Sequence, residues 1–125
     1  MLDNLKSMAS VAGLLKDLPK LKERMTALKD RLSQQTVTGE TGGGAVRVTA
    51  TGLLRVVSIE VDPAMLAGLV DSTDPQDKAM AEGLIAGAVN MALQKARELA
   101  EKEAAAAAGE LGLPLPPGIL GGLMS

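Results

Sequence analysis

Apolar residues recur at helical spacing through the first third of the chain. Steps of four, three, four, three and four residues place six of them along one side of a helix: Leu14, Leu18, Leu21, Met25, Leu28 and Leu32. The positions between them are mostly charged or polar, as on a solvated helix side. This heptad-like pattern predicts packing against another helix, from the same chain or from a second copy. Pro19 removes one backbone hydrogen bond, but the pattern continues past it, so we expect one long helix with a kink.

The middle of the chain alternates between apolar and polar residues with a period of two, which is typical of strands with one buried face. Residues 36–41 are rich in Thr and Val, and two further segments, 45–51 and 54–61, follow turns at 42–44 and at Gly52. The sequence predicts a three-stranded antiparallel meander. The residues that share an apolar face are Val46, Val48 and Ala50 in the second strand and Val57, Ile59 and Val61 in the third.

Two Asp-Pro pairs mark the starts of two further helices, because Asp is a good N-cap and Pro suits the first helical position. Asp62-Pro63 predicts a short helix to about residue 69. Asp74-Pro75 predicts a long helix to about residue 108, ended by Gly109. The alanines at 104–108 favour the helix but offer little to pack. The apolar positions of the long helix are expected to be Met80, Leu84, Val89, Met91, Ala92 and Leu99.

The last part of the sequence has a different composition. Residues 111–125 are rich in Gly and Pro, so we expect an extended tail there. The predicted fold class is α+β, with a long N-terminal helix, a three-stranded antiparallel meander, a short helix and a long C-terminal helix. Residues 1–110 would form a single domain, which is consistent with a chain of 125 residues.

The chain contains no Phe, Tyr or Trp, although 46% of its residues are hydrophobic. Its core must be built from Leu, Val, Ile, Ala and Met, without the large burial that aromatic side chains provide. A domain of this size buries only about two-thirds of its unfolded surface when it folds alone. A second copy would supply further burial, so the composition favours a homodimer.

Catalytic constellations are scarce, because the chain has neither His nor Cys. This excludes the commonest general base, the commonest metal ligand and any disulfide or thiolate metal site. Glu60 and Asp62 could pair, but Asp62 is better explained as a helix cap. The glycine-rich segment 39–44 lacks the Gly-Lys-Ser/Thr ending of a phosphate-binding loop and precedes a strand. We predict that the protein is not an enzyme and has no metal, no cofactor and no small-molecule substrate.

No apolar run reaches the roughly 20 residues that span a bilayer. The first residues also lack the basic region and continuous apolar stretch of a secretory signal. We expect a cytoplasmic protein with no membrane partner.

Basic residues are concentrated in the first helix, although the net charge of the chain is −2. Residues 1–32 hold seven basic and four acidic residues, giving +3, and residues 33–125 hold six and eleven, giving −5. The basic residues form either a solvated helix face or a surface that contacts nucleic-acid phosphates. Without aromatic residues to stack on unpaired bases, double-stranded DNA is the better nucleic-acid partner. The candidates are Lys16, Lys20, Lys22, Arg24, Lys29 and Arg31.

Three segments of the chain resemble the YbaB/EbfC family of bacterial nucleoid-associated proteins. Residues 37–49 read VTGETGGGAVRVT, which is similar to the family's V-T-G-x-S/T-G-x-G turn and the strand after it. Residues 57–66, VSIEVDPAML, resemble the family's strand followed by I-D-P-x-L-L. Residues 115–119, LPPGI, resemble its L-P-P-G ending. The segments occur in the family's order, and the resemblance covers nearly the whole chain.

The resemblance implies a tweezer-like homodimer of the nucleoid, with the sheets at the central interface and the long helices projecting as arms. Family members bind double-stranded DNA with little or modest sequence preference. Their genes often lie near genes for recombination and replication, which makes proteins of those processes candidate partners. The alternative function is a protein–protein scaffold for a DNA repair or replication partner, with little DNA binding of its own.

The family's DNA contacts are attributed to the projecting helices, so the resemblance implies phosphate contacts from basic residues of the first helix. Residues 14–16 resemble the start of the family's first helix, and residues 22–25 fall where the family has a Lys-rich, Met-rich stretch. The expected phosphate contacts are therefore Lys16, Lys20, Lys22 and Arg24, with Lys29 and Arg31 following in the same helix. Further candidates on the last helix are Lys95, Arg97 and Lys102.

Overall fold

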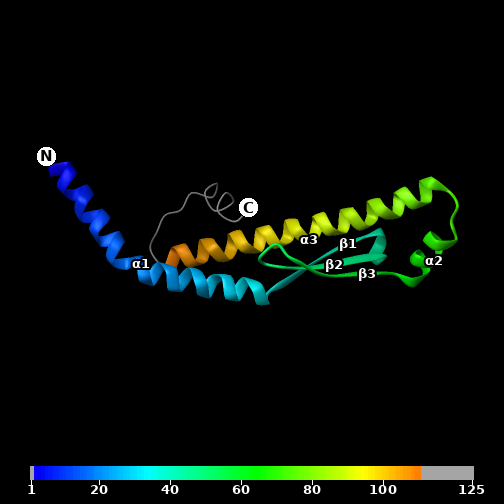
Figure 1. Cartoon of the computed structure of the whole chain (residues 1–125), viewed down its shortest axis with the longest axis horizontal. Helices are drawn as coiled ribbons and strands as arrows, with labels where there is room; N and C mark the ends of the chain where they lie inside the picture. Colours follow the sequence, from blue (N-terminus) through cyan, green and yellow to red (C-terminus); the bar gives the residue numbers. More distant parts are fainter. Residues whose placement is uncertain (1, 111–125) are drawn as a thin grey trace.

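The computed structural model describes residues 2–110, including the side chains of residues 16–110 apart from Asp17 and Val70 (Figure 1). The predicted α+β class is confirmed, and the predicted tail, 111–125, lies outside the described residues. In chain order the elements are α1 (Leu2–Gln34), β1 (Thr36–Thr41), the 3₁₀ turn η1 (Gly42–Gly44), β2 (Val46–Thr51), β3 (Val56–Val61), α2 (Pro63–Asp71) and α3 (Pro75–Glu110).

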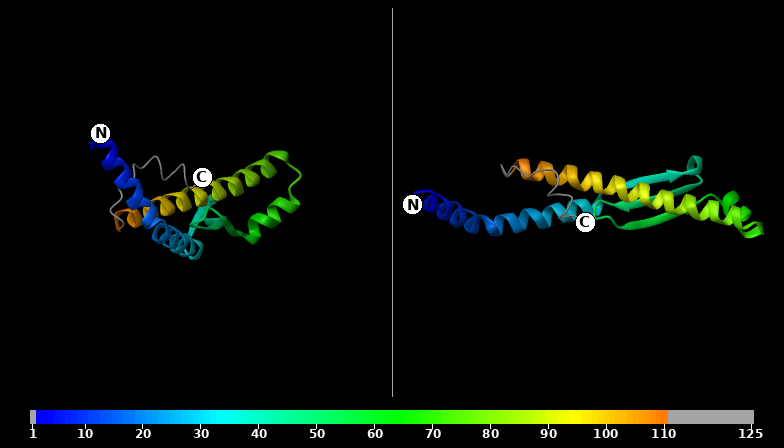
Figure 2. Two further views of the ribbon diagram at one scale, coloured as in Figure 1. Left: turned by 60° about the vertical axis from the view of Figure 1, so that its left-hand side comes forward. Right: turned by 90° about the horizontal axis from the view of Figure 1, so that it is seen from above.

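The N-terminal helix α1 is one continuous helix with Pro19 inside it, as predicted. Figure 1 shows that α1 changes direction between its dark blue N-terminal part and the lighter part that lies beside α3. Proline inside a helix removes a hydrogen bond and its ring clashes with the preceding turn, which accounts for the bend. The right-hand view of Figure 2 shows the N-terminal part of α1 extending beyond the end of α3.

The three strands form an antiparallel sheet of order β1-β2-β3, and α3 packs across one face of it. The close approach of helix and sheet depends on small residues. A Cβ atom on Gly39 of β1 would lie 2.5 Å from the backbone nitrogen of Ala92 and 2.6 Å from the carbonyl oxygen of Ala88. The hydroxyl of Thr41 donates a hydrogen bond to the carbonyl oxygen of Leu84 at 2.6 Å. The fully buried residues of this core are Val46, Val48, Ala50, Ala88, Ala92 and Ala96.

A second core joins α1 to the C-terminal half of α3. Leu28 and Leu32 of α1 are buried with Ala100 and Ala104 of α3. The heptad-like pattern of α1 is therefore used, at its C-terminal end, for packing within the chain. The expectation that the alanines at 104–108 offer little to pack is wrong, because Ala104 and Ala108 are buried. The small side chains of α3 let the two helix backbones lie close together. The larger side chains in this core come from α1, namely Leu28 and Leu32.

The apolar positions expected on α3 are only partly correct. Met80 and Met91 are exposed, and the buried residues are alanines spaced mostly four apart, namely Ala81, Ala88, Ala92, Ala96, Ala100, Ala104 and Ala108. Large apolar side chains are also exposed on β3, where Val57 is 54% and Ile59 is 49% accessible. The predicted alternation along β3 holds for Ile59 and Val61, which pair with Val48 and Val46. It is wrong for Val57, because a shift in register places Val56 opposite Ala50 instead. Helix α3 lies over β1 and β2, however, and leaves β3 largely uncovered.

The helix starts agree with the prediction, whereas one helix end does not. The carboxylate of Asp62 accepts a hydrogen bond from the backbone N–H of Ala64 at 2.8 Å, and that of Asp74 accepts one from Gln76 at 2.9 Å. Gly109 does not end α3, which continues to Glu110.

Across residues 2–110, no helix combines the length and apolar character needed to span a membrane.

Candidate nucleic-acid interface

The basic residues of α1 are presented outward because the opposite side of the helix is fixed against α3. Leu28 and Leu32 are buried against α3, and this sets the rotation of the helix around its axis. All six candidates on this helix are exposed: Lys16, Lys20, Lys22, Arg24, Lys29 and Arg31.

These basic residues do not form a single face. A helix turns by about 100° per residue, so residues four or seven apart lie on the same side. Lys16, Lys20 and Arg24 are spaced by four, and Arg31 follows seven residues later, which places all four on one flank of α1. We call these four residues the first flank. Lys22 and Lys29, seven apart, form the second flank on the other side of the helix.

Acidic residues separate the two flanks. Glu23 and Asp30 are also seven apart, and both are exposed on the side of α1 that faces away from α3. The two flanks can therefore contact two separate rows of phosphates, whereas the ridge between them repels phosphate. Sequence inspection alone shows that Glu23 and Asp30 are interspersed, but the orientation of this ridge follows only from the packing of Leu28 and Leu32.

One residue of the first flank already has an ionic partner. A guanidinium nitrogen of Arg31 lies 3.2 Å from a carboxylate oxygen of Glu103 on α3. Arg31 is half exposed, so the attraction is screened by water and contributes at most about 1 kcal/mol. The pair still lowers the positive potential at the base of α1, where the helix joins the body of the protein.

The three candidates on α3 have different surroundings. The ammonium group of Lys95 donates a hydrogen bond to the carbonyl oxygen of Thr38 at 2.9 Å, so it caps a backbone group of β1. Arg97 and Lys102 are exposed. They lie on a different helix from the two flanks, and the structure does not join all nine candidates into one surface.

Two arginines outside the predicted set lie on or beside the sheet. The Nε atom of Arg47 in β2 lies 2.8 Å from a carboxylate oxygen of Glu40 in β1. This ion pair lies on the face of the sheet that α3 does not cover. Arg55 is exposed in the turn between β2 and β3. Their positions beside the sheet could have been anticipated from the strand alternation, but nothing in the sequence near them indicates a phosphate contact.

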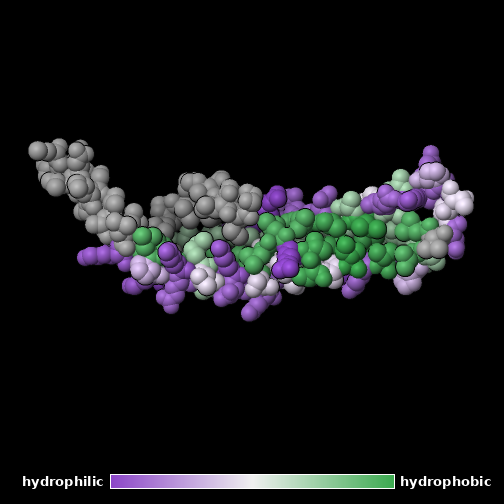
Figure 3. Space-filling view, in the orientation of Figure 1, coloured by the Kyte–Doolittle hydropathy of each residue, from purple (hydrophilic) through white to green (hydrophobic). Residues whose placement is uncertain are grey.

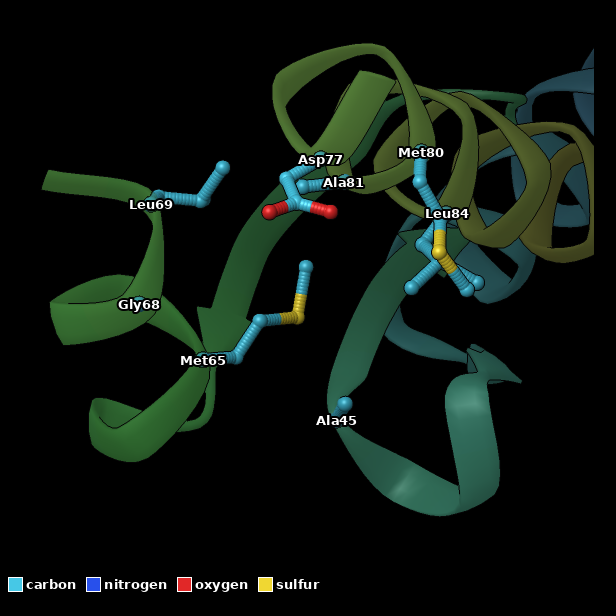
Figure 4. A pocket seen from close by; sticks show the side chains of 8 residues that line it. All are labelled: Ala45, Met65, Gly68, Leu69, Asp77, Met80, Ala81 and Leu84. Atoms are coloured by element: carbon cyan, nitrogen blue, oxygen red, sulfur yellow. The ribbon is translucent and has the colours of Figure 1, made fainter. Parts of the chain in front are cut away.

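The described residues offer little for catalysis or metal binding. Among the side chains that the structure describes, no group of three or more acidic residues could hold a metal ion. A cavity of about 350 Å³ lies between α2 and α3 and is lined by apolar residues such as Met65, Leu69 and Leu84 (Figure 4). Its charged lining residue is Asp77, which accepts a hydrogen bond from the hydroxyl of Ser72 at 2.9 Å. One carboxylate in an apolar cavity provides no acid–base pair.

Comparisons with known proteins agree with a nucleic-acid interface on this chain. The chain is 39% identical over 101 residues to a nucleoid-associated protein of Anaeromyxobacter sp. (strain Fw109-5), covering 81% of this chain and 91% of that protein. It is 35% identical over 107 residues to a nucleoid-associated protein of Moorella thermoacetica, covering 86% and 96%. A crystal structure of an uncharacterized protein, HP0035, from Helicobacter pylori shares the fold, with a TM-score of 0.54 at 23% identity over 70% of this chain and 93% of that one.

A family model settles the relationship. The model of the YbaB/EbfC DNA-binding family matches residues 8–111, which include α1 from residue 8 onward, the whole sheet, α2 and α3. This is not an enzyme family, so the prediction of a protein without enzymatic activity is confirmed. The basic helix, the covered sheet and the Asp-Pro helix starts are thus features of a chain that belongs to the YbaB/EbfC DNA-binding family.

Proposed function

We propose that the protein binds double-stranded DNA as a homodimer in the cytoplasm and is associated with the nucleoid. Basic side chains of the helical arms contact the phosphate backbone, with low sequence specificity. The observation that carries the proposal is the exposure of the basic residues along α1, in a chain whose family binds DNA. The relatives from Anaeromyxobacter and Moorella are themselves named nucleoid-associated proteins.

The phosphate backbone is the better target because of the kind of side chains present. Lys and Arg contacts to phosphate fix a protein on the duplex but carry no sequence information. The two flanks of α1 consist of four Lys and two Arg residues, and no aromatic side chain is present for stacking on bases. Contacts of this kind release counterions from the DNA, so binding must weaken steeply as salt is added.

An uncovered apolar surface supports the homodimer. Figure 3 shows a continuous green area over the part of the molecule that holds the sheet, α2 and α3. Large apolar patches of this kind are rare on monomeric proteins and mark interaction sites. Strand β3 is an edge strand of the sheet, so one of its sides has no neighbouring strand to hydrogen-bond with. The exposed large apolar residues of this region are Val57, Ile59, Leu66, Met80 and Met91.

The decisive experiment is fluorescence anisotropy of the full chain with random-sequence duplex DNA at several salt concentrations. The Lys20→Glu/Lys22→Glu/Arg24→Glu variant changes both flanks. Lys78→Glu in the first turns of α3 reverses a charge at the opposite end of the molecule and serves as the control. We expect salt-sensitive binding by the original protein and by the control, and loss of binding by the triple variant while it remains dimeric in sedimentation.

If the original protein fails to bind DNA even at low salt, DNA is not its partner. A protein of recombination, repair or replication would then be the partner to seek. If the triple variant binds as well as the original, DNA is bound elsewhere than on α1.

A further inference from the structure

The ion pair between Arg31 and Glu103 marks one side of the contact between α1 and α3. A helix turns by about 100° per residue, so Lys29, two residues before Arg31, lies about 200° around α1 from it. Leu28 and Leu32, which pack against α3, lie between these two directions. The second flank of α1 is therefore on the opposite side of the helix pair from the ion pair.

Arg97 of α3 is on the same side as the second flank. Ala100 and Ala104 are the residues of α3 that are buried against α1. Around α3 they lie between Glu103 and Arg97, which are six residues and therefore about 120° apart. Glu103 and Arg97 thus flank α1 on its two sides, and Arg97 is on the side without the ion pair.

Lys95 shows how these two sides relate to the sheet. Its ammonium group donates a hydrogen bond to the carbonyl oxygen of Thr38, so it lies on the side of α3 that faces β1. Arg97 is two residues later and about 200° around α3 from Lys95. Because the strand order is β1-β2-β3, the side of α3 turned away from β1 is the side of β3. We call the side that holds the second flank and Arg97 the β3 side.

The turn between β2 and β3 is fixed to the C-terminal end of α1 (Figure 1). The backbone N–H of Gly52 donates to the carbonyl oxygens of Leu32 and Gln35, at 3.0 Å from each. A Cβ atom on Gly52 would lie 2.8 Å from a methyl carbon of Leu32, so no side chain separates turn and helix. Arg55 is held in this turn by its carbonyl oxygen, which accepts a hydrogen bond from the N–H of Thr51 at 2.8 Å. Its side chain is exposed, directly before the start of β3.

Arg55 and Arg97 differ from two other arginines in their ionic contacts. Among the side chains that the structure describes, Arg31 and Arg47 are each paired with a glutamate, whereas neither Arg55 nor Arg97 takes part in an ion pair. Both are exposed. The guanidinium group presents a planar fork of N–H donors that matches the oxygens of a phosphate. These two arginines can therefore bind phosphate without first losing a carboxylate partner.

We propose that the basic side chains of the β3 side form one phosphate-binding row for duplex DNA, which runs from the second flank past Arg97 to Arg55. Arg55 is then a DNA contact contributed by the sheet rather than by a helix. Lys95 and Lys102, seven residues apart on the opposite side of α3, are outside this row. The inference rests on the proposed function and deepens it, because it assigns one side of the arm and the turn beside it to the same segment of the duplex.

Arg55→Gln in the full chain tests the contact from the sheet. Binding to random-sequence duplex DNA is measured by fluorescence anisotropy at several salt concentrations. The slope of log affinity against log salt should fall by about one, with a loss of about three- to tenfold in affinity at low salt. Arg47→Gln is the matched control, because it makes the same change in an exposed arginine of β2 that is already paired with Glu40. The control should keep the original slope.

Arg97→Gln and Lys102→Gln compare the two sides of α3. The two residues are about 140° apart around the helix, and each substitution removes one positive charge. Arg97→Gln should lower the salt slope by about one, and Lys102→Gln should leave it unchanged.

A tethered cleavage reagent tests proximity independently of affinity, because the chain contains no Cys of its own. Leu53→Cys, labelled with iron–EDTA, places the reagent in the turn and keeps Arg55. Leu53 is already 42% exposed. Gln76→Cys at the far end of α3 is exposed as well and serves as the control. We expect several-fold more cleavage of bound duplex DNA from residue 53 than from residue 76.

The possible results separate this inference from the proposed function. If the original protein does not bind duplex DNA at low salt, the proposed function fails and this inference fails with it. If the protein binds DNA but Arg55→Gln keeps the original salt slope, only the contact from the sheet is wrong. Equal slopes for Arg97→Gln and Lys102→Gln, or equal cleavage from residues 53 and 76, would likewise contradict the row. A weaker dimer of Arg55→Gln in sedimentation, with an unchanged salt slope, would make Arg55 a subunit contact instead.

Discussion

The body formed by α3 and the sheet differs from α1 in how each uses its side chains. In the body, alanines and Gly39 let the α3 backbone approach the strands, and Val46 and Val48 are fully buried. Among the side chains of α1 that the structure describes, only Leu28 and Leu32 are buried, and charged residues occupy the outer surface. Stability therefore rests on the body and on the two leucines that hold α1 against it, whereas the outer surface of α1 is free to present its charges to a partner. Substitutions in the two regions should separate stability from binding.

Gly39→Ala in the body should have the largest effect, which is a decrease in the free energy of unfolding. The added Cβ would meet backbone atoms of Ala92 and Ala88 at 2.5 and 2.6 Å, and backbone cannot yield as a flexible side chain can. We expect a loss of about 3 kcal/mol in urea unfolding followed by circular dichroism.

Gly83→Ala is the matched control for this substitution. Gly83 lies in α3 with no atom near the position of an added Cβ, and Ala favours a helix over Gly. This variant should gain about 0.5–1 kcal/mol. Equal effects of the two substitutions would show that helix and sheet do not approach closely at Gly39.

The next largest effect compares two neighbouring positions of α1. Leu32→Ala leaves a cavity against Ala100, because Leu32 is fully buried, and should lower the unfolding free energy by about 3 kcal/mol. Lys29→Ala, three residues away and exposed, should change stability by less than about 0.5 kcal/mol.

Of the two positions Leu32 and Lys29, the exposed one, Lys29, should affect DNA binding directly. Lys29→Ala should reduce the slope of log affinity against log salt by about one, as expected for one lost phosphate contact. An unchanged salt slope would remove Lys29 from the interface.

A third effect concerns the uncovered face of β3. Ile59→Lys places a charge in the exposed apolar surface and should weaken the dimer by about 2 kcal/mol, roughly thirtyfold in the dissociation constant. Ser58→Lys adds the same charge at the next residue, which points to the opposite face of the sheet. Sedimentation at several protein concentrations distinguishes the two, and equal dimer affinities would exclude this face as the dimer interface.

The smallest expected effect is on the ion pair between body and arm. Glu103→Gln releases Arg31 for a phosphate contact, so DNA affinity at low salt should rise by about two- to fivefold, which is within the range for one exposed pair. Glu101→Gln removes the same charge two residues earlier on α3 and is the control for net charge. The same gain in both variants would mean that the pair with Arg31 does not limit binding.

The sequence by itself determined the features that depend on neighbouring residues. The Asp-Pro pairs place the starts of α2 and α3, because the cap forms between Asp62 and Ala64 and between Asp74 and Gln76. Strand alternation located the sheet, and the spacing of apolar residues located α1, since side-chain periodicity follows from backbone geometry. The match to the family's motifs was likewise visible in the sequence.

Only the tertiary structure decided which surfaces are covered. Val48 and Ile59 are equally apolar and are paired across the sheet, yet α3 buries one and leaves the other exposed. The alanines of α3 are buried because the backbone of α3 lies close to the strands and to α1, where only small side chains fit. A sequence analysis that looks for large apolar residues does not find them. The sequence also could not show that Arg31 and Lys95 contact Glu103 and Thr38, because residues 72 and 57 positions apart meet only through the fold.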